Sequence, residues 1–124
     1  MSKIILGVFS GIVVGLIVGH LTTKYFLVEP IPIGYVRVTV DNKSGQNIKT
    51  LTLKHENGSI EMKNLSENEN VNLIFKNGGE NSYRIFAMLD NDSIVSSRGN
   101  YVEAGYRTTE IIFADRVKTE NDKY

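Results

Sequence analysis

The sequence predicts a mainly β protein, in which one N-terminal transmembrane helix is followed by a small antiparallel β-sandwich of about seven strands. Three observations support this prediction. An uncharged apolar run covers Ile4–Leu21, apolar and polar residues alternate from Tyr35 onward, and turn-forming residues interrupt that alternation at short intervals. The expected organisation is a cytoplasmic stub (1–3), a transmembrane signal-anchor helix (4–24), a proline-containing linker (25–34), the β-sandwich (35–117) and a flexible polar tail (118–124).

The apolar run is long enough to cross a membrane as a helix. Its eighteen residues carry no charge, and in an α-helix they span roughly 27 Å, close to the hydrocarbon thickness of a bilayer. A cleavable secretory signal also begins with a basic residue such as Lys3, but its apolar part is shorter and ends at an Ala-x-Ala site, which is missing here. We therefore expect an uncleaved signal anchor, with a cleaved signal peptide and a buried soluble helix as alternatives.

The position of the run also predicts a location. The stub before it is too short to hold a domain, so we expect the N-terminus in the cytoplasm and the C-terminal domain outside it. The sequence contains no cysteine, whereas small secreted domains of eukaryotes usually carry disulfides. This favours a bacterial cell envelope, with the domain in the periplasm or at the cell surface.

Four glycines recur along one stripe of the predicted helix, at Gly7, Gly11, Gly15 and Gly19. Small residues at this spacing allow two helix backbones to approach closely, which predicts a homodimer formed through the membrane segment. The alternative is that glycine is simply common in membrane helices. The segment after the helix, Glu29–Gly34, contains both prolines of the chain and is expected to be a short stiff spacer.

The strands are predicted from alternation and from turn residues. Val36, Val38 and Val40 share one face of the first strand, and Asn57-Gly58 is a strong hairpin signal between two alternating stretches. The expected strands are 35–41, 48–55, 59–63, 71–75, 82–89, 94–98 and 108–117. Because 82–89 is apolar on both faces, we expect it to be a central strand covered on both sides.

Tyr83 follows Gly78-Gly79-Glu80 at the start of this apolar strand. That placement is similar to the tyrosine corner of immunoglobulin-like and fibronectin-like domains. The resemblance implies an immunoglobulin/fibronectin-like sandwich over the β part of the chain. Because fold alone does not carry function, it implies no activity.

Composition limits the possible functions. After residue 28 the chain has 12 Lys/Arg and 14 Asp/Glu, a net charge of −2. This balance gives no basic footprint for nucleic acid, and it argues against a polybasic patch that binds a membrane surface. Without cysteine there is no thiolate nucleophile and no Cys-ligated metal.

Candidate chemistry is sparse, so we expect no enzyme activity, no catalytic residue, no cofactor and no metal. The chain has two histidines. His20 ends the predicted membrane helix, His55 precedes a hairpin turn, and the sequence indicates no partner nucleophile for either of them. Asp90-Asn91-Asp92 begins like a calcium loop, but the sixth position is Val95 where glycine is needed. A turn accounts for these acidic residues.

The remaining candidates are the residues Tyr101, Tyr106 and Arg107, because Tyr and Arg are enriched where proteins bind one another. Alternatively, the tyrosines cover a sheet edge. We expect a module for protein recognition in the cell envelope, such as an envelope complex subunit or an accessory or immunity-type protein. A small-ligand or sensing module, which would have a deep apolar pocket, and a secreted sandwich with a cleaved signal are the alternatives.

Overall fold

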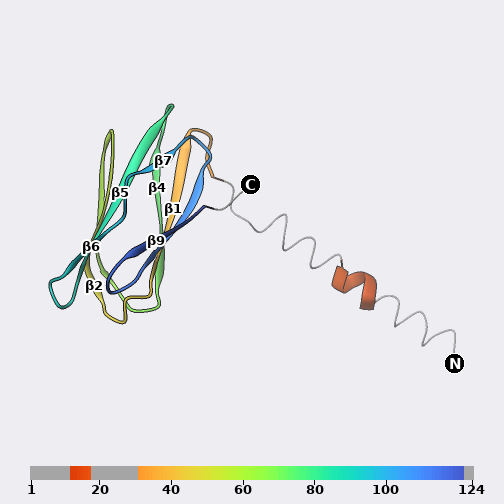
Figure 1. Cartoon of the computed structure of the whole chain (residues 1–124). Helices are drawn as coiled ribbons and strands as arrows, with labels where there is room; N and C mark the ends of the chain where they lie inside the picture. The colour runs from red at the N-terminus through yellow and green to blue at the C-terminus, as the bar shows by residue number, and fades with distance from the viewer. Residues whose placement is uncertain (1–11, 18–30, 122–124) are drawn as a thin grey trace, which may run out of the picture. The chain divides into compact units, whose positions relative to one another are not determined.

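The computed structural model describes residues 12–17 and 31–121, which belong to two compact units, residues 1–30 and Ile31–Tyr124 (Figure 1). In the first unit, residues 12–17 are helical and exposed. No helix in the described ranges has the length and apolar character needed to span a membrane. The predicted stub, most of the predicted membrane helix, and linker residues 25–30 lie outside the described residues.

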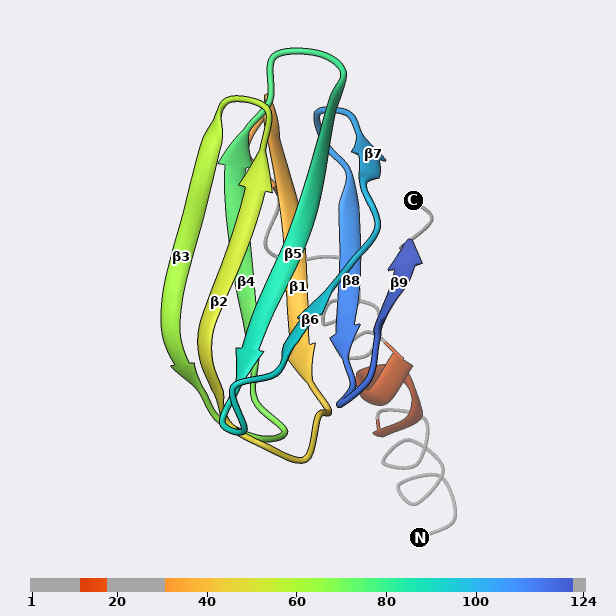
Figure 2. The ribbon, with the colours of Figure 1, turned by 60° about the vertical axis from the view of Figure 1, so that its left-hand side comes forward.

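The second unit is a sandwich of two β-sheets that face each other (Figure 2). Its strands are β1 (Tyr35–Asn42), β2 (Ile48–His55), β3 (Gly58–Leu65), β4 (Asn70–Lys76), β5 (Asn81–Leu89), β6 (Ile94–Ser96), β7 (Asn100–Val102), β8 (Arg107–Ile112) and β9 (Val117–Asn121). One sheet has the order β4-β1-β8-β9, and the other has the order β3-β2-β5-β6 with β7 also paired to β5. The predicted two-layer β architecture is confirmed.

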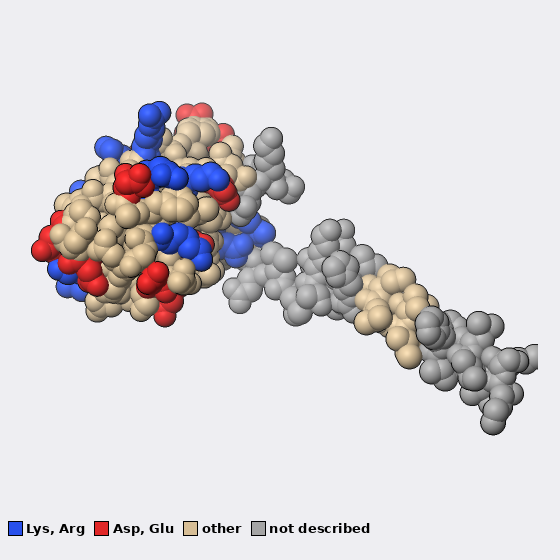
Figure 3. All heavy atoms as spheres, turned by 60° about the horizontal axis from the view of Figure 1, so that its bottom comes forward, with Lys and Arg blue, Asp and Glu red and all other residues tan. Residues whose placement is uncertain are grey.

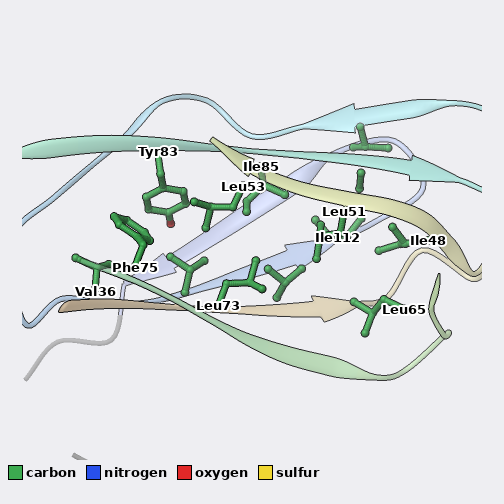
Figure 4. Close-up of a cluster of buried hydrophobic side chains, with 14 of the residues drawn as sticks. Val36, Ile48, Leu51, Leu53, Leu65, Leu73, Phe75, Tyr83, Ile85 and Ile112 are labelled. Carbon is green, nitrogen blue, oxygen red and sulfur yellow. The ribbon is translucent and has the colours of Figure 1, made fainter. Parts of the chain in front are cut away.

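The core follows from the alternation in the sequence. Every second residue of β1 points between the sheets, so Val36, Val38 and Val40 are fully buried. Opposite them, β5 contributes Ile85 and Leu89, which are also fully buried. Figure 4 shows Val36 and Ile85 among the side chains that meet between the sheets. Each such side chain stabilises the fold by about 1.5–3 kcal/mol through removal of apolar surface from water.

The sequence predicted an antiparallel sandwich, but one pair of strands is parallel. β1 and β8 pair in parallel, with Arg37 opposite Arg107 and Asn42 opposite Ile112, whereas the other strand pairs of the described sandwich are antiparallel. Alternation reveals which face of a strand is buried but not the direction of the strand beside it. A parallel pair between distant segments is therefore invisible to the pattern.

The last predicted strand, 108–117, is wrong as a single element. The chain turns back after β8, where the amide of Phe113 donates to the carbonyl of Arg116 at 2.8 Å. The returning strand β9 includes residues 118–121, which the sequence assigned to a polar tail. Phe113 and Ala114 are apolar and carried no turn signal. Lys118 and Glu120 face outward, so the segment that contains them was read as a polar tail.

β5 is also not covered on both sides. Its inner face is buried, but Met88 is 36% exposed and Phe86 is half-buried on the outer face. The cationic groups of Lys54 and Arg84 lie 5.1 and 5.4 Å from the centre of the Phe86 ring. Long basic side chains therefore cover the ring where a third layer was expected, because their stems are apolar and their charges stay in water.

Candidate functional site

The feature of the sandwich that packing alone does not explain is a buried carboxylate. Glu110 lies on the inner face of β8 between Thr108 and Ile112, and it is 0% exposed. A buried charge is costly unless hydrogen bonds or an opposite charge compensate it. Within the described ranges Glu110 forms no ion pair. Hydrogen bonds therefore have to compensate its burial.

Two cross-strand pairs face each other around this carboxylate. Thr119 is the register partner of Glu110 in β9, and Asn100 is the register partner of Tyr83 in the other sheet. The Tyr83 hydroxyl and the Asn100 amide both donate to Oε1 of Glu110, each at 2.6 Å, and the Thr119 hydroxyl donates to Oε2 at 2.9 Å. Asn100 Nδ2 also lies 3.3 Å from Thr119 Oγ1, so the four side chains form one network between the sheets.

The network shifts two ionisation equilibria. Burial raises the pKa of Glu110 above its ordinary value, and the hydrogen bonds from its three partners only partly oppose that effect. Burial, followed by the nearby carboxylate, also raises the pKa of Tyr83. The phenol therefore keeps its proton and remains the donor in the bond to Glu110.

Tyr83 thus differs from the tyrosine corner that the sequence suggested. In that motif the tyrosine hydroxyl bonds to the backbone of a nearby segment. Here the side chain points from β5 toward the opposite sheet (Figure 4), where its hydroxyl bonds to the carboxylate of Glu110. The residue was correctly placed at the start of an apolar strand, but its partner was not predicted.

A cleft opens next to the network, on the side of the sandwich where β6 and β7 of one sheet lie opposite β9 of the other. Its volume is about 560 Å³. The residues that line it are Ile94, Val95, Ser96, Arg98, Asn100, Asp115, Arg116, Val117 and Thr119. Because Asn100 and Thr119 belong to both the cleft and the network, a ligand in the cleft would touch the groups that hold Glu110.

The charged residues of this cleft differ in their partners. Arg116 lies 3.3 Å from Asp115 and stacks on Phe113, with its guanidinium carbon 4.7 Å from the ring centre. In the described part of the chain, Arg98 makes no ion pair. On the face of the molecule in Figure 3, acidic and basic side chains are interspersed, in line with the near-balanced composition.

The structure brings together only two of the three predicted partner-surface residues. The rings of Tyr101 and Tyr106 meet edge to face with centroids 6.4 Å apart, and Tyr101 is 52% exposed. The Tyr101 hydroxyl donates to Glu103, which raises its pKa. Arg107 belongs to the other sheet, where it lies opposite Arg37.

Residues for which the sequence predicted no functional role, such as His55 and Asp92, take part in structural contacts. His55 stacks on Phe75 with ring centroids 4.5 Å apart, and burial lowers the pKa of its imidazole. Asp92 pairs with Lys49 at 2.7 Å. Within the described ranges, no three histidine or acidic side chains are grouped so that they could hold a metal ion.

Comparison with known proteins adds information on the fold. No family model and no curated protein matches the sequence. The chain is similar to a protein from Eubacterium rectale whose structure was determined by NMR, with a TM-score of 0.61 and 11% sequence identity. The similarity covers 73% of this chain and 92% of that protein. At this identity the likeness shows a shared fold.

Sequence reasoning missed the Glu110 network and the cleft. One signal was present, because Glu110 has the same parity as Ile112 and alternation therefore places it inside. Alternation could not predict the hydrogen-bond partners of Glu110. Tyr83, Asn100 and Thr119 come from three other strands, which belong to both sheets.

Proposed function

We propose that the chain is a non-enzymatic, single-pass membrane protein of the cell envelope, whose sandwich lies outside the cytoplasm and binds a protein partner. It would act as a subunit of an envelope complex or as an accessory or immunity-type protein. The observation that carries the proposal is the open cleft between β6–β7 and β9, together with Tyr101, which is exposed on β7, the strand that contributes Asn100 to the cleft.

The composition of this side of the sandwich supports protein recognition. Arg98 has no ion pair among the described residues and Ile94 is 63% exposed, so a cation and an apolar side chain are both available to a partner. Tyr101 adds a large ring, and tyrosine and arginine are the residue types that most often dominate binding energy. β9 also forms an edge of its sheet, to which an extended segment of a partner can add.

A small-ligand module is the second candidate, because about 560 Å³ lies within the range of small-molecule pockets. Two features make it the weaker candidate. The cleft is open, and only three of its nine lining residues, Ile94, Val95 and Val117, are aliphatic. A sensing module was expected to have a deep apolar pocket.

The membrane tether rests on the sequence of residues 4–24. We propose that this segment is an uncleaved signal anchor and that its glycine stripe joins two copies of the chain. Carbonate extraction of membranes and the intact mass of the chain separate an anchor from a cleaved signal. Replacement of Gly11 and Gly15 by isoleucine should abolish a crosslinked dimer, and a dimer that persists contradicts the stripe. We also propose that the sandwich is immunoglobulin/fibronectin-like, which its two facing sheets support.

Site-specific photocrosslinking in cells tests the proposed partner site. A photoreactive residue at Arg98 should crosslink one protein, identified by mass spectrometry, and the same residue at exposed Lys63 on β3 should not. The double variant Tyr101→Ala/Tyr106→Ala should lose the adduct while keeping its circular dichroism spectrum. Equal adducts at both positions, or an adduct indifferent to the double variant in a folded protein, contradict the site.

A further inference from the structure

The pairings of β1 with β8 and with β4 place three basic residues together that are far apart in sequence. Arg37 lies opposite Arg107 in β8 and opposite Ile74 in β4, and Lys76 lies opposite Tyr35 in the next position of the same face. All of these residues alternate with buried neighbours and therefore belong to the outer face of this sheet. We call Arg37, Lys76 and Arg107 the cationic cluster.

Among the described residues, none of the three members of the cationic cluster forms an ion pair. The four ion pairs in the described part of the chain involve other residues. Two acids lie on the outer face of this sheet. Asp41, at the far end of β1, pairs with Lys43, and Glu120, which lies opposite Thr109 and therefore diagonal to Arg107, pairs with Lys118. Like charges on neighbouring strands repel one another. The cluster therefore favours an external anion.

Apolar side chains surround these charges. Ile74, directly opposite Arg37, is 44% exposed, and Ile33, just before β1, is fully exposed. Tyr35 is half-buried on the same face. A surface that combines cations with exposed aliphatic and tyrosine side chains has the composition of segments that lie at a membrane–water interface.

The chain itself limits how far this surface can be from a membrane. The predicted membrane helix ends at residue 24, and β1 begins at Tyr35. Even fully extended, the ten residues between them reach only roughly 36 Å at about 3.6 Å per residue. The cluster lies in the first residues of β1 and in the strands beside it, so it is at the end of the sandwich that the linker joins.

We propose that the cationic cluster, with Ile74 and Ile33, docks on anionic lipid headgroups of the membrane that anchors the chain. This inference rests on the proposed tether. The net charge of −2 after residue 28 argued against a basic membrane patch, but an average over the domain does not describe one face. Each cation near an anionic surface contributes an affinity factor of about fivefold.

Because the sequence contains no cysteine, a single introduced cysteine can be labelled selectively, and this allows a test of the proposal. The full chain carries a single Ile74→Cys substitution, labelled with an environment-sensitive fluorophore, and is reconstituted into vesicles. Ile94→Cys, on an exposed residue of the other sheet, is the matched control. In vesicles of phosphatidylcholine with phosphatidylglycerol, a quencher carried on the lipid should quench the label at position 74 several-fold more than the label at 94. Phosphatidylcholine alone should remove most of that difference.

Charge variants complete the experiment. Arg37→Gln/Arg107→Gln should abolish the quenching at 74, whereas Lys43→Gln/Lys63→Gln, which removes the same charge elsewhere, should leave it unchanged. Circular dichroism confirms that each variant is folded. If carbonate extracts the chain from the vesicles, the proposed membrane tether is wrong. A chain that stays in the membrane but shows equal quenching at 74 and 94, or quenching indifferent to phosphatidylglycerol, overturns the docking proposal alone.

Discussion

The hydroxyl of Tyr83 donates a hydrogen bond of 2.6 Å to Glu110, and the two residues belong to opposite sheets. Most contacts between the sheets are made by aliphatic side chains, which have no preferred direction. The bond from Tyr83 is directional, and Asn100 and Thr119 fix the same carboxylate from two other strands. The network therefore sets the position of β7 and β9 relative to the core, and these strands form the cleft.

Truncation of the carboxylate should destabilise the protein. Glu110→Ala leaves the hydroxyl of Tyr83 and the amide of Asn100 buried without their acceptor, and it creates a cavity, so we expect a loss of about 3 kcal/mol in the free energy of unfolding. Glu110→Gln keeps an acceptor oxygen and the volume, and it should cost clearly less. Urea denaturation measures both, and equal losses in the two variants contradict the proposed role of the acceptor.

The raised pKa of Glu110 predicts a pH dependence. A carboxyl group whose pKa is higher in the folded state stabilises the fold while it is protonated, and this contribution is lost as pH rises through the folded pKa. The free energy of unfolding of the natural chain, relative to Glu110→Gln, should therefore fall as pH rises above 4.5, the ordinary value. Urea denaturation of both chains across this range checks the sign. A relative stability that rises with pH contradicts it.

Removal of the Tyr83 hydroxyl should weaken the connection between the sheets. A hydrogen bond to a charged group contributes about 1.5–3 kcal/mol, so Tyr83→Phe should lower the free energy of unfolding by that amount. Tyr101→Phe is the matched control, because the Tyr101 hydroxyl also donates to a carboxylate but is exposed. The control should change stability very little. Similar effects of the two substitutions would show that the buried bond has no special weight.

Much of the sandwich could be predicted from local patterns. β2 begins and ends at the predicted residues, and β1 extends only one residue beyond its prediction. β1 alternates throughout, β2 alternates from Leu51 after a register shift between Ile48 and Thr50, and turn residues such as Asn57-Gly58 follow β2. Phe113 and Ala114 are apolar although they lie in a turn, so the prediction joined two strands into one.

The candidate sites were harder to predict because they depend on pairings between distant strands. Alternation placed Glu110 on the inner face of its strand, but no sequence pattern predicted that β7 and β9 would face each other across the cleft. Likewise, Arg37 and Arg107 become neighbours only through the parallel pairing. No local periodicity reports such a pairing, because its partners are set by the packing of the whole chain.

Asn42 should be intolerant of a carboxylate. It is fully buried, and its amide nitrogen donates to the carbonyls of Gln46, Leu65 and Ser66 at 2.8–3.1 Å. Asn42→Asp replaces this donor with an acceptor that faces three other acceptors, so we expect a loss of at least about 3 kcal/mol at neutral pH. Asn72→Asp, at an exposed position of β4, is the control and should cost little. Thermal denaturation ranks them, and equal melting temperatures contradict the prediction.

The correction at β9 leads to a prediction about truncation. If residues 118–121 were a flexible tail, a chain ending after Arg116 would lose only Val117 from the sandwich and would be nearly as stable as the full chain. In the structure this truncation removes β9, including the Thr119 hydroxyl that donates to Glu110 and the half-buried Val117 that packs against the core. We therefore expect it to lower the free energy of unfolding by about 2–4 kcal/mol, on the order of one lost half-buried apolar contact and one lost charged hydrogen bond. A chain ending after Asn121 retains β9 and is the matched control. Urea denaturation should separate the two truncations, and equal stability of both would mean that β9 contributes nothing to the sandwich.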